Sequence, residues 1–270
     1  MWKHKLQEAL ARSVNLPNAV LEAQKELDKA ICFYLGEAEK FEPLANRLNQ
    51  DQTAALYPSE FRMPYDACLH EALVENVDKE YPVRIFSLIY RQQNRKNVYR
   101  VIAFGLEEGK NSTLYMSNCY GIFGEGYNEM ICKNIYSGEI EDTNLSSLFV
   151  VGCSIAHLAL LFLSCKNITT RTVLAPERLN KKRRKNHRLP ICEYKVLEIK
   201  PLSGAHYSAA SPSQPSQGLM RVHLCRGHFK EYPPDRPLFG KYSGRFWWQP
   251  IVRGEKKRGI LNKDYAIKNY

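Results

Sequence analysis

Two histidines near the C-terminal end of the chain, His223 and His228, have the side chains that phosphodiester cleavage requires. The unperturbed pKa of histidine lies near neutral pH, so one imidazole can remove the 2′-hydroxyl proton of RNA while the other protonates the leaving oxygen. Arg226 lies between them and can stabilise the charge that develops on the phosphorane. These three residues are the candidate catalytic set of a ribonuclease that uses no metal and no cofactor.

This set needs a strand followed by a bend. The strand expected over 219–225 would place His223 on one face, and a β-bulge at Gly227 would turn His228 toward the same side. The alternative is that Arg226 and His228 hold a turn through hydrogen bonds to backbone carbonyls and stack on a nearby tryptophan. A zinc site is a third reading, but the spacing of the two histidines and Cys225 matches no common zinc motif, and no fourth ligand is near.

Basic side chains cluster in a second segment, which we expect to form a loop over 178–190. Its candidate phosphate contacts are Lys181, Lys182, Arg183, Arg184, Lys185 and Arg188. Aromatic and basic residues also alternate near the C-terminus, a composition suited to single strands because bases stack on aromatic and guanidinium planes. The candidate contacts there are Lys230, Lys241, Arg245, Trp247 and Trp248. The alternative for the basic run is a solvated surface segment.

The charge of the chain is unevenly distributed. The 270 residues contain 39 lysines and arginines and 28 acidic residues, a formal net charge of +11. From Lys166 onward there are 23 basic and 7 acidic residues, whereas the chain before it has 16 basic and 21 acidic residues. A concentrated basic surface favours a polyanionic partner, most often nucleic acid.

The first part of the chain has helical periodicity. Leu21, Leu27 and Tyr34 belong to an apolar stripe near helical spacing, and a stretch over 41–48 could continue it. Short β-branched and aromatic runs with polar connections then predict an antiparallel meander over Met63–Leu69, Val83–Tyr90, Val98–Phe104 and Ser112–Cys119. The glycines over 121–126 follow no βαβ unit, so they indicate a turn and not a dinucleotide site.

A long apolar stretch follows the meander. Residues 148–165 contain no Asp, Glu, Lys or Arg. The length of this stretch is at the lower limit for a membrane-spanning helix, and its composition is also typical of a buried helix. Ser154 and His157 interrupt the run, and no second span or aromatic belt accompanies it, so we expect a buried helix at about 144–165. N-cap residues at 142–144 mark its start.

These segments predict an α+β fold with a helical N-terminal region, an antiparallel sheet packed on a long apolar helix, and basic C-terminal β strands. We expect a helical region over 1–60, an α+β core over 61–202, a flexible Ser/Ala/Pro-rich linker over 203–218, a basic aromatic β segment over 219–254, and a basic tail over 255–270. Further strands are expected at Thr169–Val173 and Tyr194–Ile199.

The N-terminus has no apolar signal region, and the eight cysteines include no Cys-x-x-Cys pair. We therefore expect a cytoplasmic protein with eight reduced thiols and no membrane association.

Three groups of residues resemble a family of uncharacterised phage-, prophage- and plasmid-encoded proteins. They are Phe61–Tyr65, the basic run Leu179–Lys185 with Tyr194–Leu197, and the pattern His223–Phe229 with Leu238–Lys241 and Trp247-Trp248. The resemblance extends over about 61–254 and implies a bacterial host cell, but it transfers no catalytic assignment.

The sequence therefore predicts a phage- or prophage-derived protein that binds RNA or single-stranded nucleic acid, with a toxin-like ribonuclease activity as the sharper form. The rival is a non-enzymatic host-takeover or defence factor whose N-terminal helices bind a protein partner. Salt-dependent RNA binding would favour the first class of function.

Overall fold

The computed structural model describes residues 2–37, 63–74, 82–107, 113–127, 130–141, 145–200, 221–225, 227–248, 251–253 and 255–260, with the backbone alone for 221–225, 251–253 and 255–260. The chain divides into two compact units. The main unit comprises Met1–Ser164 and Thr169–Glu198, and the C-terminal unit comprises Cys165–Ile168 and Ile199–Tyr270. The short segment 165–168 thus belongs to the C-terminal unit.

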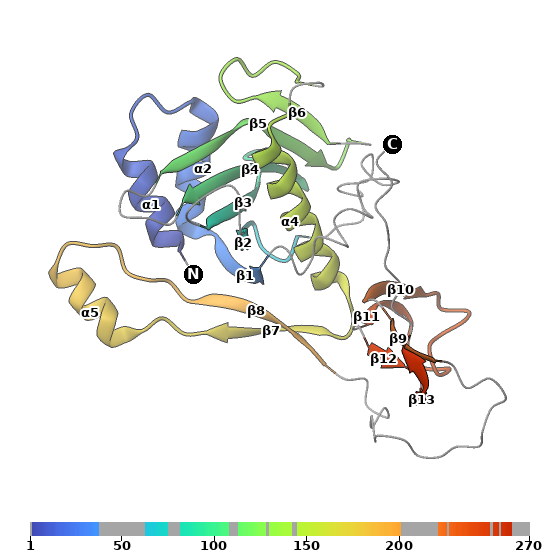
Figure 1. Ribbon diagram of the computed structural model, residues 1–270. Coiled ribbons are helices and arrows are strands. Elements are labelled where there is room, and N and C mark those ends of the chain that lie inside the picture. The colour runs from blue at the N-terminus through green and yellow to red at the C-terminus, as the bar shows by residue number, and fades with distance from the viewer. Residues whose placement is uncertain are drawn as a thin grey trace. The chain divides into compact units, whose positions relative to one another are not determined.

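An eight-stranded, mostly antiparallel sheet forms the centre of the main unit, which confirms the α+β class (Figure 1). The strand order is β6-β5-β4-β3-β2-β1-β8-β7. Strands β2 to β6 are joined as antiparallel neighbours, whereas β1 is parallel to both β2 and β8. The bounds are β1 Ile31–Glu37, β2 Ala67–Val74, β3 Val83–Arg91, β4 Val98–Glu107, β5 Leu114–Gly124, β6 Ile131–Asn134, β7 Ile168–Val173 and β8 Tyr194–Ile199.

The predicted meander corresponds to β2, β3, β4 and β5, but several bounds differ. β2 spans Ala67–Val74 and not Met63–Leu69, β4 continues to Glu107, and β5 spans Leu114–Gly124 and not Ser112–Cys119. Gly121 therefore lies inside a strand and not in a turn. Gly121 is required there because a Cβ would collide with the side chains of Met130 and Val101. Gly124 ends the strand at φ +119°, a conformation that glycine adopts readily.

The N-terminal region has two helices, α1 over Lys3–Arg12 and α2 over Asn18–Lys29. The prediction that the helical stripe continues to Tyr34 is wrong, because Ile31–Glu37 forms β1. Its β-branched and aromatic residues favour a strand, and it pairs on both sides within the sheet. The stretch 41–48 lies outside the described residues.

Both N-terminal helices are part of the core and do not form a separate region. Their buried side chains, Leu6, Leu10, Val20, Ala23 and Leu27, share one hydrophobic cluster with residues of the sheet such as Phe86 and Phe104. Arg100 of β4 forms an ion pair with Glu22 and further links α2 to the sheet.

The apolar stretch forms α4 over Ser147–Ser164. Ser146 precedes the helix, and its hydroxyl accepts a hydrogen bond from the Phe149 N–H at 3.3 Å, which is N-cap chemistry. The caps predicted at 142–144 lie outside the described residues. Phe149, Cys153, Ala156 and Leu160 share a buried cluster with Ile89, Val101, Cys119 and Phe123 of the sheet.

Alternate residues along β3 belong to two different hydrophobic clusters. Ile89 belongs to the cluster that contains α4, while Leu88 and Tyr90 belong to the cluster that contains α1 and α2. Among the described helices, α4 alone is long and apolar enough to cross a membrane, and 56% of this helix is buried inside the protein.

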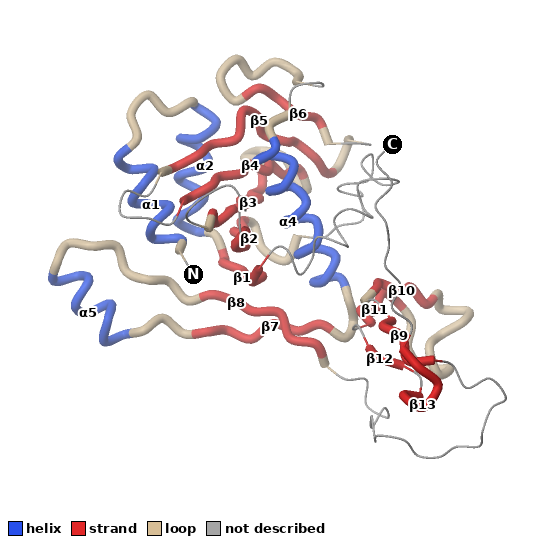
Figure 2. Tube along the Cα trace, in the orientation of Figure 1, coloured by secondary structure: helices blue, strands red, loops and turns tan. Residues whose placement is uncertain are grey.

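The strands β7 and β8 at one edge of the sheet are connected through a helix. β7 leads into α5, which spans Glu177–Lys185, and the chain returns through β8 (Figures 1 and 2). The segment predicted as a loop over 178–190 is therefore largely helical. Most of its residues are good helix formers, and Glu177 lies in the first turn, where an acidic side chain stabilises the helix dipole.

The C-terminal unit contains two small sheets. One is the hairpin β10 (His228–Tyr232) with β11 (Gly244–Trp248), and the other has the order β12-β9-β13. The bounds of the latter are β9 Arg221–Cys225, β12 Ile251–Arg253 and β13 Glu255–Ile260. The segment predicted as a tail from 255 thus begins with a strand, while the predicted linker 203–218 lies outside the described residues.

Candidate nucleic-acid interface

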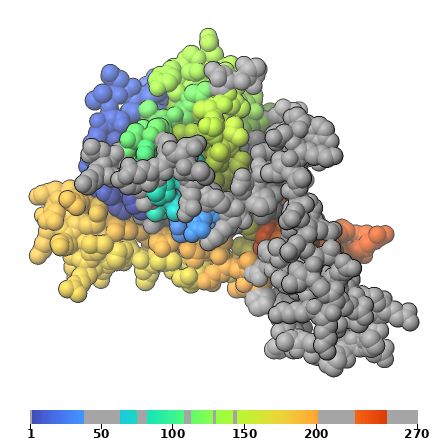
Figure 3. Space-filling view, viewed as in Figure 1, coloured from blue at the N-terminus to red at the C-terminus, as the bar shows by residue number. Residues whose placement is uncertain are grey.

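The outward face of α5 carries a row of basic side chains. Arg178, Lys181, Lys182 and Lys185 have the spacing i, i+3, i+4 and i+7, so they lie on one side of the helix, and all four are exposed. We call these four residues the basic stripe. Figure 3 shows this part of the chain, in yellow, at the surface. Arg178 was not among the predicted contacts, because its place in the stripe appears only when the run is recognised as a helix.

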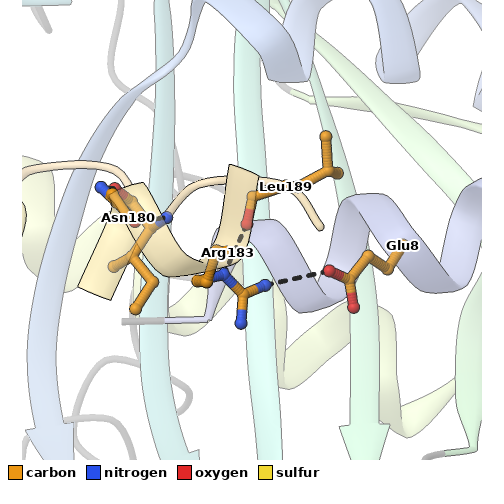
Figure 4. A network of polar contacts seen from close by, with 5 residues as sticks. Glu8, Asn180, Arg183 and Leu189 are labelled. Atoms are coloured by element: carbon orange, nitrogen blue, oxygen red, sulfur yellow. Dashed lines mark hydrogen bonds and ion pairs between the residues drawn. The ribbon is translucent and has the colours of Figure 1, made fainter. Parts of the chain in front are cut away.

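The opposite side of α5 attaches the helix to the main unit. Asn180 is 6% exposed, and its side chain bonds to both backbone groups of Ile191, with Nδ2 donating to the carbonyl at 2.8 Å and Oδ1 accepting from the N–H at 2.7 Å. Arg183 donates from Nε to the Leu189 carbonyl at 2.6 Å and pairs with Glu8 of α1 at 3.0 Å (Figure 4). The side chain of Arg183 is 13% exposed.

The C-terminal end of α5 is closed by a Schellman motif. His187 has φ +52°, its N–H donates to the Arg184 carbonyl, and the Arg188 N–H donates to the Arg183 carbonyl at 2.9 Å. These bonds fix the backbone at the point where Arg184, Lys185 and Arg188 present exposed side chains. The basic charges around this end also interact favourably with the helix dipole.

Of the six basic residues predicted in this run, five are exposed, and Arg183 is used inside the protein. Lys181 forms an ion pair with Glu177 at 3.3 Å, but both side chains are more than two-thirds exposed. Such a pair contributes little to stability and leaves Lys181 accessible to a phosphate. Arg183 does not fit the predicted role of phosphate contact, because its guanidinium already binds a carboxylate and a carbonyl.

The two faces of the β10–β11 hairpin differ. The register pairs Lys230 with Phe246 and His228 with Trp248, so these residues and Tyr232 share one face. Lys230 is exposed, and its ammonium lies 4.9 Å from the centre of the Tyr232 ring. Trp248 is half-buried, and its Nε1 has no hydrogen-bond partner among the described residues.

The other face of the hairpin contains Trp247 and Arg245. Trp247 is 8% exposed and packs against Phe229 with ring centres 4.7 Å apart, so it cannot stack on a base as predicted. Its backbone bonds to the buried Asn167, whose Nδ2 donates to the Trp247 carbonyl at 2.8 Å and whose Oδ1 accepts from the Trp247 N–H at 2.9 Å. Arg245 pairs with Glu231 across the hairpin at 3.1 Å.

An exposed aromatic residue that sequence reasoning missed lies in the connection between β10 and β11. Phe239 is 71% exposed and has φ +54°, and Gly240 follows at φ +69°. Two consecutive positive φ values, with the Lys241 N–H bonded to the Leu238 carbonyl at 3.1 Å, are typical of a type I′ turn. Phenylalanine rarely adopts a positive φ, and this unusual backbone conformation marks Phe239 as a candidate functional residue.

Lys241 follows this turn and is exposed, with its ammonium 5.3 Å from the Tyr242 ring. The turn and the Lys230 face of the hairpin therefore combine cations with exposed aromatic surface within the C-terminal unit. This is the chemistry that a single-stranded nucleic acid requires.

The two candidate catalytic histidines belong to different sheets. His223 belongs to β9 and His228 begins β10, so Gly227 joins two strands of different sheets and is not a bulge within one strand. His228 is exposed. The side chain of His223 and the whole of Arg226 lie outside what the structure describes. Within the described parts of the chain, no three His, Cys, Asp or Glu side chains are grouped as metal ligands would be.

No protein-family model, no curated protein and no solved structure matches this chain. Its activity must therefore be inferred from the chemistry of its own residues.

Proposed function

We propose that this protein binds RNA or single-stranded nucleic acid through the basic stripe of α5, as a phage- or prophage-encoded protein in the cytoplasm of a bacterial host. The observation that carries the proposal is the two-sided character of α5. One side is anchored by Asn180 and Arg183, and the other presents the basic stripe to solvent. Like charges at i+3 and i+4 destabilise a helix, and bound phosphates would relieve that repulsion.

The C-terminal unit offers a second set of contacts of the same kind. Lys230 and Lys241 can contact phosphates, while Phe239 and the half-buried Trp248 can stack on bases. These side chains supply stacking, which α5 lacks, and α5 supplies most of the charge. A ligand of the C-terminal unit that uses this stacking would be single-stranded, because its bases must be free to stack.

The rival proposal is a protein partner bound through the N-terminal helices. It is favoured less, because α1 and α2 bury their apolar residues against the sheet. An interface there would have to use their polar faces. RNA binding that weakens steeply with salt would favour the nucleic-acid proposal over this rival.

The direct test is titration of a fluorescent single-stranded RNA of about 20 nucleotides at several salt concentrations. The triple variant Lys181→Ala, Lys182→Ala, Lys185→Ala should reduce affinity, and the slope of log K against log salt should become shallower by about 0.7 per lost phosphate contact. The matched control removes the same charge elsewhere, at the exposed Arg12, Lys25 and Lys96. Equal losses of RNA affinity in both triple variants would mean that binding depends on net charge alone and not on the basic stripe.

The sharper form of the proposal is metal-independent RNA cleavage with His223 and His228 as base and acid and Arg226 as the phosphate clamp. Cleavage that persists in EDTA and disappears in both His223→Ala and His228→Ala would support it. His187→Asn is the control, since this exposed residue follows α5, outside the candidate catalytic set, and asparagine tolerates its positive φ. If neither histidine variant alters RNA turnover, the catalytic assignment fails.

We further propose that α4 is a helix of a soluble core on which the sheet packs, and not a membrane span. This is supported by the buried cluster that α4 shares with β3, β4 and β5 and by the close approach of Gly152 to Ala103. After cell lysis without detergent and high-speed centrifugation, the protein should remain in the supernatant. Recovery only in the detergent-extracted membrane pellet would overturn this assignment.

A further inference from the structure

Two thiols from distant parts of the sequence meet beside α5. Sγ of Cys32 and Sγ of Cys192 lie 3.8 Å apart, although 160 residues separate them in the chain. Cys32 belongs to β1 and is 2% exposed. Cys192 belongs to the segment that connects α5 to β8 and is partly exposed. One thiol is therefore accessible to a small oxidant, and its neighbour is sheltered and in contact with it.

The surroundings of the pair distinguish the two sulfurs. The hydrogen bond with Cys32 holds the pKa of the Cys192 thiol below its usual range, and the positive charge of Lys3 acts in the same direction against burial. The same hydrogen bond, together with burial, raises the pKa of Cys32. The Lys3 ammonium is itself fixed, because it donates to the carbonyls of Asp28 at 3.0 Å and Ala30 at 3.1 Å.

Other cysteines of the main unit have the opposite character. Burial raises the pKa of both Cys68 and Cys119 to about 12. Thiols of this kind react slowly, because the thiolate is the nucleophile.

We propose that Cys32 and Cys192 form a redox-active dithiol that closes reversibly to a disulfide. The Cys192 thiolate attacks a peroxide, which breaks the O–O bond, gives a sulfenic acid and releases hydroxide that is protonated to water. The sulfur of Cys32 then attacks that of Cys192, loses its proton and expels a second water. Two thiols and one peroxide thus become one disulfide and two waters, and a dithiol reductant reverses the oxidation.

The position of the pair gives the disulfide a structural consequence for α5. Cys192 directly follows Ile191, and both backbone groups of Ile191 are bonded to Asn180 of α5. A bond to Cys32 would tie this segment covalently to β1 in the middle of the sheet. Oxidation would therefore restrain the anchored side of α5. This inference is independent of the proposed function, because it concerns the chemistry of the pair whatever α5 binds.

The test is oxidation of the full-length, reduced protein with a small excess of hydrogen peroxide, followed by alkylation of the remaining thiols and peptide mass spectrometry. We expect the number of free thiols to fall by two from the eight of the chain, with a linked peptide that contains Cys32 and Cys192. Dithiothreitol should restore both thiols. Loss of thiols at other cysteines, or an adduct on Cys192 with Cys32 still free, would overturn the proposal.

Variants identify the roles of the two sulfurs. Cys192→Ser should abolish the rapid loss of thiols, whereas Cys32→Ser should leave a sulfenic acid on Cys192 that a dimedone probe captures. Cys68→Ala is the matched control and should still lose two thiols. If Cys32→Ser fails to fold, the rate of Cys192 alkylation in the wild-type protein decides, since it should begin to rise at lower pH than that of an ordinary cysteine. An ordinary pH profile would overturn the role of Cys192 as the attacking thiolate.

Discussion

Arg183 belongs to the basic run of α5, but its side chain binds other parts of the protein. Its guanidinium donates to the Leu189 carbonyl and to the Glu8 carboxylate, whereas its neighbour Lys182 is exposed on the other side of α5. The two residues are adjacent in a run of similar charges, but their side chains point in different directions because successive residues in a helix are rotated by about 100°.

We therefore expect Arg183→Ala to affect mainly the stability of the protein and Lys182→Ala to affect mainly its RNA affinity. Arg183→Ala should lower the free energy of unfolding by about 1–2 kcal/mol, because it leaves a carbonyl and a partly buried carboxylate without their partner. Lys182→Ala should change it by less than about 0.5 kcal/mol and should instead weaken RNA binding. Urea unfolding and RNA titration of both variants measure the contrast, and similar stabilities would contradict it.

Phe239 carries a prediction about stacking. Phe239→Asn should keep the turn, because asparagine tolerates positive φ, and should remove the aromatic surface. We expect RNA affinity to fall by a factor of about 5 to 150, which corresponds to a loss of about 1–3 kcal/mol for a stacked base, while the melting temperature stays the same or rises. Phe239→Tyr is the control that keeps the ring. Unchanged affinity in Phe239→Asn would show that no base stacks there.

His70 predicts the response of stability to acid. It is fully buried in β2 against Phe33, and burial lowers its pKa to about 4, against a smaller opposing effect of the Ser87 backbone. The unfolded state binds the proton near pH 6.5, so stability should fall as pH drops from 6.5 toward 4, by about 2 kcal/mol at pH 5 from this residue. Burial lowers the pKa of His4 in the same direction.

The measurement is the free energy of unfolding in urea at pH 7 and at pH 5. His70→Leu should lose about half of the acid-induced destabilisation, because His4 still contributes. His187→Asn, at an exposed position, should behave as the wild-type protein. An unchanged acid response in His70→Leu would mean that His70 is already protonated in the folded state.

At the scale of elements, strands and helices are positioned by single buried amides. Asn180 connects α5 to the segment before β8, and Asn167 connects the segment 165–168 to β11. In each case one side chain bonds to both the N–H and the C=O of another residue. A buried amide that satisfies two backbone groups fixes the spacing of two segments more tightly than apolar contacts can.

Replacement of Asn167 should therefore destabilise the C-terminal unit. Asn167→Ala removes both bonds to the Trp247 backbone in a buried site and should cost about 2 kcal/mol. Hydrogen exchange should then increase in β10 and β11 but not in β3 and β4. Ser243→Ala, at an exposed position beside the same strand, is the control. Equal protection in both variants would contradict this role for Asn167.

At the scale of the molecule, the two units interleave along the chain. The C-terminal unit includes Cys165–Ile168, which lies in the sequence between α4 and most of β7. A fragment that starts near residue 199 therefore lacks this segment of the unit. We expect residues 199–270 alone to remain unfolded, with a narrow range of amide proton chemical shifts. A dispersed spectrum from this piece would show that Asn167 and its neighbours are dispensable.

Much of the fold could be predicted from local patterns. The sequence predicts β8 to the residue, the starts of β3 and β4 at Val83 and Val98, and the extent of α4 within a few residues, because alternation and long apolar runs are local properties. It predicts a helix where Ile31–Glu37 forms a strand, since a strand paired on both sides has no polar alternation to distinguish it from a buried helix.

The sequence by itself determined that positive charge and aromatic residues are concentrated after the apolar helix. Only the tertiary structure decided which of those side chains remain available. It turned the basic run into a helix with an anchored and an open side, buried Trp247 while exposing Phe239, and brought together Cys32 and Cys192 from opposite ends of the main unit. The reason is physical: composition is additive along the chain, whereas exposure and proximity depend on contacts between residues that are far apart in it.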